Sequence, residues 1–174
     1  MKRYSDKEAQ IIIDKLKKKS FSALHLLFKI EDVPLFEELE GETAGSFLAW
    51  NPKNPFWIKF FMKILFNSPF ARWTGKKFIT PFDKENRGKG VNLFRNRILP
   101  HRFRFDTYIK KAQIDHNVCL ALDYRDYRSL MFGLVDDVRK IEDGVFLGQM
   151  YYKFPWKKEL WFLGYFVLCA LKKS

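Results

Sequence analysis

Charged and phenolic side chains are concentrated in one short run of the sequence, Leu-Asp-Tyr-Arg-Asp-Tyr-Arg at residues 122–128. In an extended chain, Asp123, Arg125 and Tyr127 share one face. Buried charges must be paired, so whichever face turns inward would form a polar anchor in an apolar cavity. The alternative is a ladder of ion pairs on the surface, which would contribute little stability. The residues on the opposite face are Tyr124, Asp126 and Arg128.

Two further runs carry groups that could bind a ligand or react. Trp73 and Lys76 flank a glycine that permits a bend at the start of a strand. Asp136 and Asp137 are adjacent, so in a strand they point to opposite faces and do not form a carboxylate pair that shares a proton. An enzyme that uses Asp123, Asp136 or Asp137 as a base remains an alternative, since distant residues can assemble a catalytic site.

The histidines do not form a metal-binding pattern. His25, His101 and His116 lack the spacing of metal ligands, and neither cysteine belongs to a CxxC pair. The sequence also lacks a P-loop, a G-x-G-x-x-G run and a G-x-S-x-G elbow. We therefore expect no metal and no cofactor, and we favour binding over catalysis. Haem ligated by His116 or His101 is a further option.

Two kinds of periodicity indicate which elements position these residues. Residues 1–40 are predicted to be helical, with Ser5 and Glu8 at capping-box spacing, and a further helix is expected at 55–67 after Asn54. From about residue 72 the apolar period changes to two, which predicts an antiparallel barrel or sandwich. The expected strands are 43–50, 76–82, 90–96, 102–109, 118–124, 131–138, 145–151 and 160–171.

Length and composition indicate one globular domain, 1–174, with a helical extension at 1–40 and the barrel at 41–174. Aromatic residues make up 18% of the chain, and 19 are Phe, which must line a core, a cavity or an interface. The net charge of +12 is concentrated in residues 51–111, which hold 15 basic and 3 acidic residues. Such a segment attracts polyanions, including anionic lipid head groups, although a solvated basic surface would look the same.

The predicted helix at 55–67 combines a basic stripe with large apolar side chains. Lys59 and Lys63 lie one turn apart among residues that include Phe56 and Trp57. This helix is expected either to pack on the barrel or to lie shallowly in an anionic membrane surface. No apolar run reaches the length of about 20 residues that a membrane span needs, and no signal peptide is evident. We expect a cytoplasmic location, with peripheral membrane attachment as an option.

Several of these runs resemble one family. Trp-Thr-Gly-Lys-Lys-Phe at 73–78, Leu-Asp-Tyr at 122–124, Val-Asp-Asp-Val-Arg-Lys-Ile at 135–141, Asp-Gly at 143–144 and Leu-Gly at 147–148 are similar to motifs of the uncharacterised GXWXG/DUF4334-type bacterial proteins. The resemblance covers roughly residues 36–152. It implies a calycin-like (lipocalin-like) barrel that binds a lipophilic ligand without catalysis. The first family motif, G-x-W-x-G, here reads Gly-Ser-Phe-Leu-Ala at 45–49, with Phe in place of Trp.

The sequence therefore predicts a non-enzymatic barrel that binds a lipophilic or amphipathic small molecule. Arg125 or Tyr127 would hold its polar group. Single-stranded nucleic-acid binding is a weaker alternative, because alternation in Arg102–Phe105 puts Phe and Arg on opposite faces, whereas stacking needs them together. The ligand and the oligomeric state are not specified. The candidate ligand-binding residues are Trp73, Lys76, Asp123, Arg125, Tyr127 and Arg139.

Overall fold

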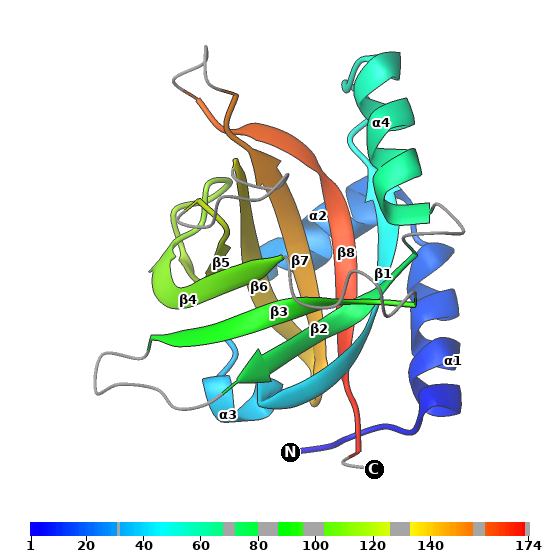
Figure 1. The fold of residues 1–174 in the computed structure, drawn as a ribbon, viewed down its shortest axis with the longest axis vertical. Coiled ribbons are helices and arrows are strands. Elements are labelled where there is room, and N and C mark those ends of the chain that lie inside the picture. Colours follow the sequence, from blue (N-terminus) through cyan, green and yellow to red (C-terminus); the bar gives the residue numbers. More distant parts are fainter. Residues whose placement is uncertain are drawn as a thin grey trace.

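The computed structural model of the protein describes residues 1–30, 32–67, 72–79, 87–95, 103–125, 133–154 and 159–172. These residues form a closed antiparallel barrel with helices on its outside (Figure 1). The helices are α1 (Asp6–Lys17), α2 (Phe21–Ile30), α3 (Phe36–Leu39) and α4 (Phe56–Asn67). The strands are β1 (Gly41–Trp50), β2 (Trp73–Ile79), β3 (Gly88–Phe94), β4 (Arg104–Lys111), β5 (Val118–Asp123), β6 (Leu134–Glu142), β7 (Val145–Tyr152) and β8 (Trp161–Ala170).

The predicted fold class, a mainly β antiparallel barrel with N-terminal helices and a helix near 55–67, is confirmed. The element boundaries differ from the expected ones. β2 begins at Trp73 rather than at Lys76, and β6 continues to Glu142 rather than ending at Val138. Parts of the expected strands, residues 80–82, 96, 102 and 131–132, lie outside the described residues.

The strands are connected in the simplest order. Each pairs antiparallel with its neighbour in the chain, and β8 pairs with β1 to close the barrel. At the turn between β6 and β7, Gly144 has φ +76°, and a Cβ atom there would lie 2.1 Å from the carbonyl oxygen of Lys2. The Asp-Gly pair at 143–144 therefore forms this hairpin turn.

A bulge in β2 gives the barrel interior its polar group. The register against β3 shifts between Trp73 and Gly75, so that Trp73 and Lys76 are both buried although three positions separate them. Gly75 has φ +151°, and a Cβ atom there would lie 1.9 Å from the carbonyl oxygen of Thr43. Only glycine fits this approach of β2 to β1, and without the bulge Lys76 would point outward.

Helices α1 and α2 cover the outside of the barrel, and the short α3 lies at one end of it. The capping box of Ser5 and Glu8 starts α1, which packs on β1 and β8 through Ile13 and Leu16. Helix α2 buries Leu24 and Phe28 against the outer face of the sheet. The short α3 contributes Leu39 to the cluster inside the barrel, at the end where β1 begins. Within the described ranges, no helix has both the length and the apolar character needed to cross a bilayer.

Candidate ligand site inside the barrel

A cluster of polar side chains is buried inside the barrel. Lys76 of β2 lies 3.1 Å from the Oδ2 atom of Asp136 on β6, and both side chains are almost fully buried. The ammonium group of Lys76 also donates to Oδ1 of Asn92 at 3.0 Å and to the hydroxyl of Tyr124. Asn92 accepts a further hydrogen bond at 2.9 Å from the indole N–H of Trp73. We call these five residues the interior cluster.

Aromatic rings surround the charged centre of the interior cluster. The Nζ atom of Lys76 lies 5.1 to 5.4 Å from the ring centroids of Trp73, Phe105, Tyr124 and Phe166. The faces of aromatic rings attract cations at this distance, which favours the ammonium form. Burial lowers the pKa of Lys76 and raises the pKa of Asp136, while the attraction between the two charges opposes both shifts. Burial also raises the pKa of the Tyr124 phenol well above its usual value.

A small cavity borders the interior cluster. Its volume is about 20 Å³, which is enough for about one water molecule. An eight-stranded barrel is either filled by side chains or holds one small ligand. The cavity is lined by Phe47, Trp73, Lys76, Asn92, Tyr124, Leu134, Asp136, Met150 and Phe166.

Partly buried aromatic side chains lie beside this core at one end of the barrel, where β7 ends and β8 begins. We call this end the mouth. Phe47 and Trp50 stack there with centroids 3.8 Å apart, and Tyr152 contacts Phe154 edge to face at 4.7 Å. These side chains and Trp161 are only partly buried. They can be turned aside more easily than the fully buried rings behind them.

Helix α4 extends this aromatic surface at the mouth. Ile58 packs into the core, and the Trp57 ring contacts Phe154 with centroids 6.4 Å apart. Even so, Trp57 is 59% exposed, Phe56 is 81% exposed and Phe60 is 56% exposed. The helix therefore packs on the barrel, as one of the two expectations had it, and still presents large apolar side chains to solvent.

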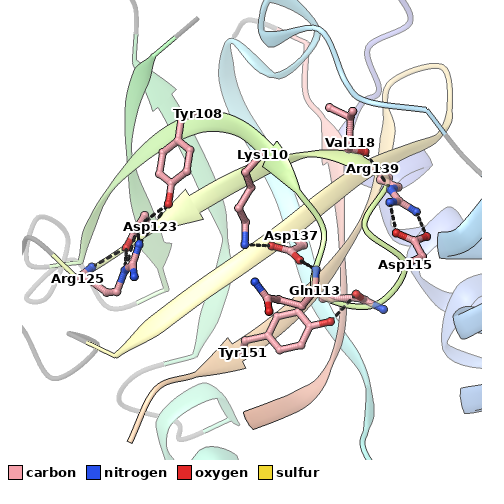
Figure 2. A network of polar contacts seen from close by, with 11 residues as sticks. Tyr108, Lys110, Gln113, Asp115, Val118, Asp123, Arg125, Asp137, Arg139 and Tyr151 are labelled. Atoms are coloured by element: carbon pink, nitrogen blue, oxygen red, sulfur yellow. Dashed lines mark hydrogen bonds and ion pairs between the residues drawn. The ribbon is translucent and has the colours of Figure 1, made fainter. Parts of the chain in front are cut away.

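The outer wall of the barrel carries most of the other predicted residues (Figure 2). Asp123 accepts hydrogen bonds there from the Tyr108 hydroxyl at 2.8 Å and from the Arg125 guanidinium. The alternation of β5 explains this position, because Leu122 and Tyr124 belong to the inner cluster and Asp123 points the other way. The Arg125 side chain is 45% exposed, so it does not face an enclosed space.

Arg139 also lies on the outer wall, where it is completely buried. Its guanidinium donates two hydrogen bonds of 2.7 Å to the Asp115 carboxylate (Figure 2). It donates a third, of 2.8 Å, to the carbonyl of Phe28 in α2. Its Nε–H donates to the carbonyl of Val118 at 3.3 Å. These bonds fasten α2 and the turn before β5 to the sheet, so Arg139 is separated from the cavity by the barrel wall.

The structure thus divides the candidate residues into two groups. Trp73 and Lys76 belong to the interior cluster, whereas Asp123, Arg125 and Arg139 lie outside the barrel and contact neither of them. Tyr127, Asp126 and Arg128 lie outside the described residues. The sequence left open which face of residues 123–128 turns inward. Among the described residues of this run, Tyr124 lines the cavity, whereas Asp123 and Arg125 do not.

The adjacent aspartates also separate as expected. Asp136 points inward, and Asp137 points outward, where it pairs with Lys110 at 2.6 Å and accepts from the backbone N–H of Gln113 at 2.9 Å. Neither can share a proton with the other, so the described geometry provides no carboxylate dyad at this point.

The alternative functions find little support among the described residues. Phe103 and Phe105 are buried while Arg104 is exposed, so these residues do not form a combined stacking and phosphate-binding face. His116 sits exposed at the turn before β5 with φ +58°, and His101 lies outside the described residues. No group of three or more metal-ligating side chains occurs in the described ranges.

Sequence reasoning missed Asn92 and Phe166 as parts of the site. Asn92 carries a usable signal, because it lies between Gly90 and Phe94 on the face of β3 that alternation turns inward. Phe166 carries no such signal, because β8 is apolar on both faces. One face contributes to the barrel core and the other packs against α1 and α2.

The fold and the site together define a class: closed eight-stranded antiparallel barrels with a polar cluster in an aromatic interior. No family model and no curated protein matches the sequence. A crystal structure of a protein from Thermomonospora curvata is similar, with a TM-score of 0.52 and 15% sequence identity over 95% of this chain and 97% of that chain. At this identity the similarity supports the barrel fold alone. The resemblance to the GXWXG/DUF4334-type proteins stays a prediction.

Proposed function

We propose that this protein binds a small amphipathic molecule in its barrel without chemically changing it. The observation that carries the proposal is the interior cluster, a buried ion pair placed beside a cavity and surrounded by aromatic rings. Ligand pockets typically combine apolar walls with a few convergent polar groups that fix the orientation of the ligand. The polar group of the ligand would lie against the interior cluster, and its apolar part would extend toward the mouth.

The size of the cavity limits how the ligand enters. The present volume of about 20 Å³ accepts the polar end alone, so the apolar part needs space that the partly buried aromatic side chains at the mouth must vacate. Phe47 both lines the cavity and stacks on Trp50, so its movement would connect the cavity to the mouth. Binding is therefore expected to change the environment of Trp50.

Titration with 1-decanol, followed by tryptophan fluorescence, tests this proposal. Wild-type protein should show a saturable change. Met150→Trp should abolish it, because the larger side chain fills the cavity from β7. Ile11→Trp, at an exposed position of α1, is the matched control and should bind like the wild type. Equal responses of the two variants would contradict binding in the barrel. Native mass spectrometry of freshly purified protein can identify a natural ligand.

A second observation favours action at an anionic membrane surface. The exposed rings of Phe56, Trp57 and Phe60 form an apolar face on α4, beside Lys59 and Lys63 of the same helix. Aromatic side chains combined with lysines are typical of helices that lie in the interface of a bilayer. Other basic residues described at this end of the barrel are Lys53, Arg72, Arg95, Arg104, Arg125 and Lys153, whereas Glu159 is the exposed acidic residue described there.

Co-sedimentation with vesicles tests the membrane proposal. Binding should occur on vesicles that contain anionic lipid, should be weaker on neutral vesicles and should fall as salt is added. The triple variant Phe56→Ser/Trp57→Ser/Phe60→Ser should lose it. Leu26→Ser, which changes an exposed apolar residue on α2, should not. Equal retention of the triple variant and the wild type would exclude α4 as the contact.

A further inference from the structure

We infer that the ligand meets the interior cluster with a neutral hydrogen-bond donor, such as the hydroxyl of a primary alcohol, and not with a carboxylate. This inference rests on the proposed function and specifies the chemical class of its ligand. A buried lysine in a lipid-binding barrel would ordinarily suggest an anionic ligand. The hydrogen bonds of the cluster indicate the opposite.

The ammonium group of Lys76 has no donor left for a ligand. An ammonium carries three N–H donors. Three oxygen atoms already lie within reach of it: Oδ1 of Asn92 at 3.0 Å, the hydroxyl of Tyr124, and Oδ2 of Asp136 at 3.1 Å. The Asp136 carboxylate also neutralises its charge. An incoming carboxylate would have to displace one of these partners, and it would bring a second negative charge beside Asp136.

The other donors of the cluster are also used. Asn92 donates its two amide N–H groups to the carbonyl of Phe103 at 3.3 Å and to the hydroxyl of Tyr124 at 3.1 Å. The amide orientation is fixed, because Oδ1 faces the indole N–H of Trp73 and the ammonium of Lys76, which are both donors only. The hydroxyl of Tyr124 lies within donating distance of Oδ2 of Asp136, at 3.4 Å.

One acceptor remains. The Oδ1 atom of Asp136 is buried and accepts no hydrogen bond from any residue in the described part of the chain. A buried carboxylate oxygen without a donor is costly, and Asp136 lines the cavity. The cluster therefore offers a ligand an acceptor that belongs to an anion, and hydrogen bonds to charged groups are the stronger ones.

The size of the cavity supports the same class of ligand. A volume of about 20 Å³ admits a group of roughly one non-hydrogen atom, such as a hydroxyl. A carboxylate places three non-hydrogen atoms at the same point and would require the buried rings around Lys76 to move. Size thus favours a small polar group, and the hydrogen bonds of the cluster favour one that donates.

A ligand series with a constant apolar chain tests this inference. The probes are 1-decanol, its methyl ether and decanoate, and the Kd of each is measured by tryptophan fluorescence. The methyl ether keeps the oxygen and loses the donor. The alcohol should bind about tenfold or more tightly than either of the others, because only it can donate to Oδ1 of Asp136. Tightest binding by decanoate would overturn the inference and leave the proposed function standing. Failure of all three probes to bind would overturn both.

Substitution of the acceptor gives a second test. In Asp136→Asn, the amide oxygen can face Lys76 while an amide N–H replaces Oδ1, so the free position becomes a donor. The preference for the alcohol over the methyl ether should then disappear. Asp137→Asn makes the same change at the adjacent residue on the outer wall and should keep the wild-type preference. An unchanged preference in Asp136→Asn would place the polar group of the ligand elsewhere. If Asp136→Asn does not fold, the comparison of the three probes on wild-type protein tests the inference by itself.

Discussion

Asp136 and Arg139, three positions apart on β6, participate in two buried ionic groups that face opposite sides of the barrel wall. Inside, Lys76 and Asp136 border a cavity, and one carboxylate oxygen lacks a hydrogen-bond donor among the described residues. Outside, Arg139 holds both oxygens of Asp115 and two backbone carbonyl groups. The outer group is saturated and connects elements of the fold, whereas the inner group keeps one unsatisfied acceptor beside a cavity. The proposed binding rests on this difference and not on the burial of charge alone.

The largest expected effect on stability comes from breaking the inner pair of Lys76 and Asp136. Asp136→Ala leaves the Lys76 ammonium buried without its counter-ion, which should lower the free energy of unfolding by about 3–5 kcal/mol. Urea denaturation measures the loss. The double variant Lys76→Met/Asp136→Leu removes both charges and should recover most of it. If the single variant is as stable as the wild type, the pair is not buried as described.

Breaking the outer group should cost less. Arg139→Met removes the bonds to Phe28 and Val118 and leaves the Asp115 carboxylate, which retains some access to water. We expect a loss of about 2 kcal/mol, together with faster amide hydrogen exchange in α2. Binding of 1-decanol should be unchanged, since Arg139 lies across the barrel wall from the cavity. Weaker binding of 1-decanol by the folded variant would contradict the separation of the outer group from the cavity.

The outer group should also make stability depend on acid pH. Hydrogen bonds from Arg139 lower the pKa of Asp115 below its ordinary value. The unfolded chain therefore binds this proton more readily than the folded protein does, so the contribution of Asp115 is present above about pH 4 and is lost as the pH falls through the lower folded pKa. Asp115→Asn should be about 1 kcal/mol less stable than the wild type at pH 7, and this difference should shrink toward pH 3. Urea denaturation over this range checks it, and a constant difference would exclude the assigned cause.

The smallest effect is expected at an exposed pair on the same barrel. Glu42 of β1 and Lys77 of β2 lie opposite each other, with Nζ of Lys77 3.2 Å from Oε1 of Glu42. About half of each side chain is exposed. Glu42→Gln should change the free energy of unfolding by less than about 1 kcal/mol, and added salt should reduce the change further. If Glu42→Gln lowers the free energy of unfolding as much as Arg139→Met does, solvent exposure does not explain the difference between the exposed pair and the buried outer group.

The sequence predicted the elements better than the site. Local signals were sufficient for the capping box at Ser5 and for the alternating strands, because each depends on neighbours in the chain. Alternation in β5 also placed Tyr124 with Leu120 and Leu122, so the outward position of Asp123 was contained in the pattern. The bulge at Gly75, by contrast, depends on the approach of β1, and no local period indicates it.

The pairing of Lys76 with Asp136 could not be predicted for a related reason. It joins β2 to β6, two strands that are not neighbours in the sheet, and they meet only across the interior of the closed barrel. Contacts of this kind follow from the curvature of the whole sheet. A single sequence carries no record of that curvature, although the unusual polar residues at inward positions mark where such contacts should be sought.

The short bridge between Tyr4 and Leu171 has a practical consequence. The backbone N–H of Tyr4 donates to the carbonyl of Ala170 at 2.9 Å, so the first and last described segments leave the barrel together (Figure 1). They do so beside the turn at Asp143, at the opposite end from Tyr152 and the mouth. A sensor chip or fluorescent fusion partner attached through either segment would therefore leave the mouth unobstructed. The same protein could be tethered by both segments in parallel without stretching the barrel.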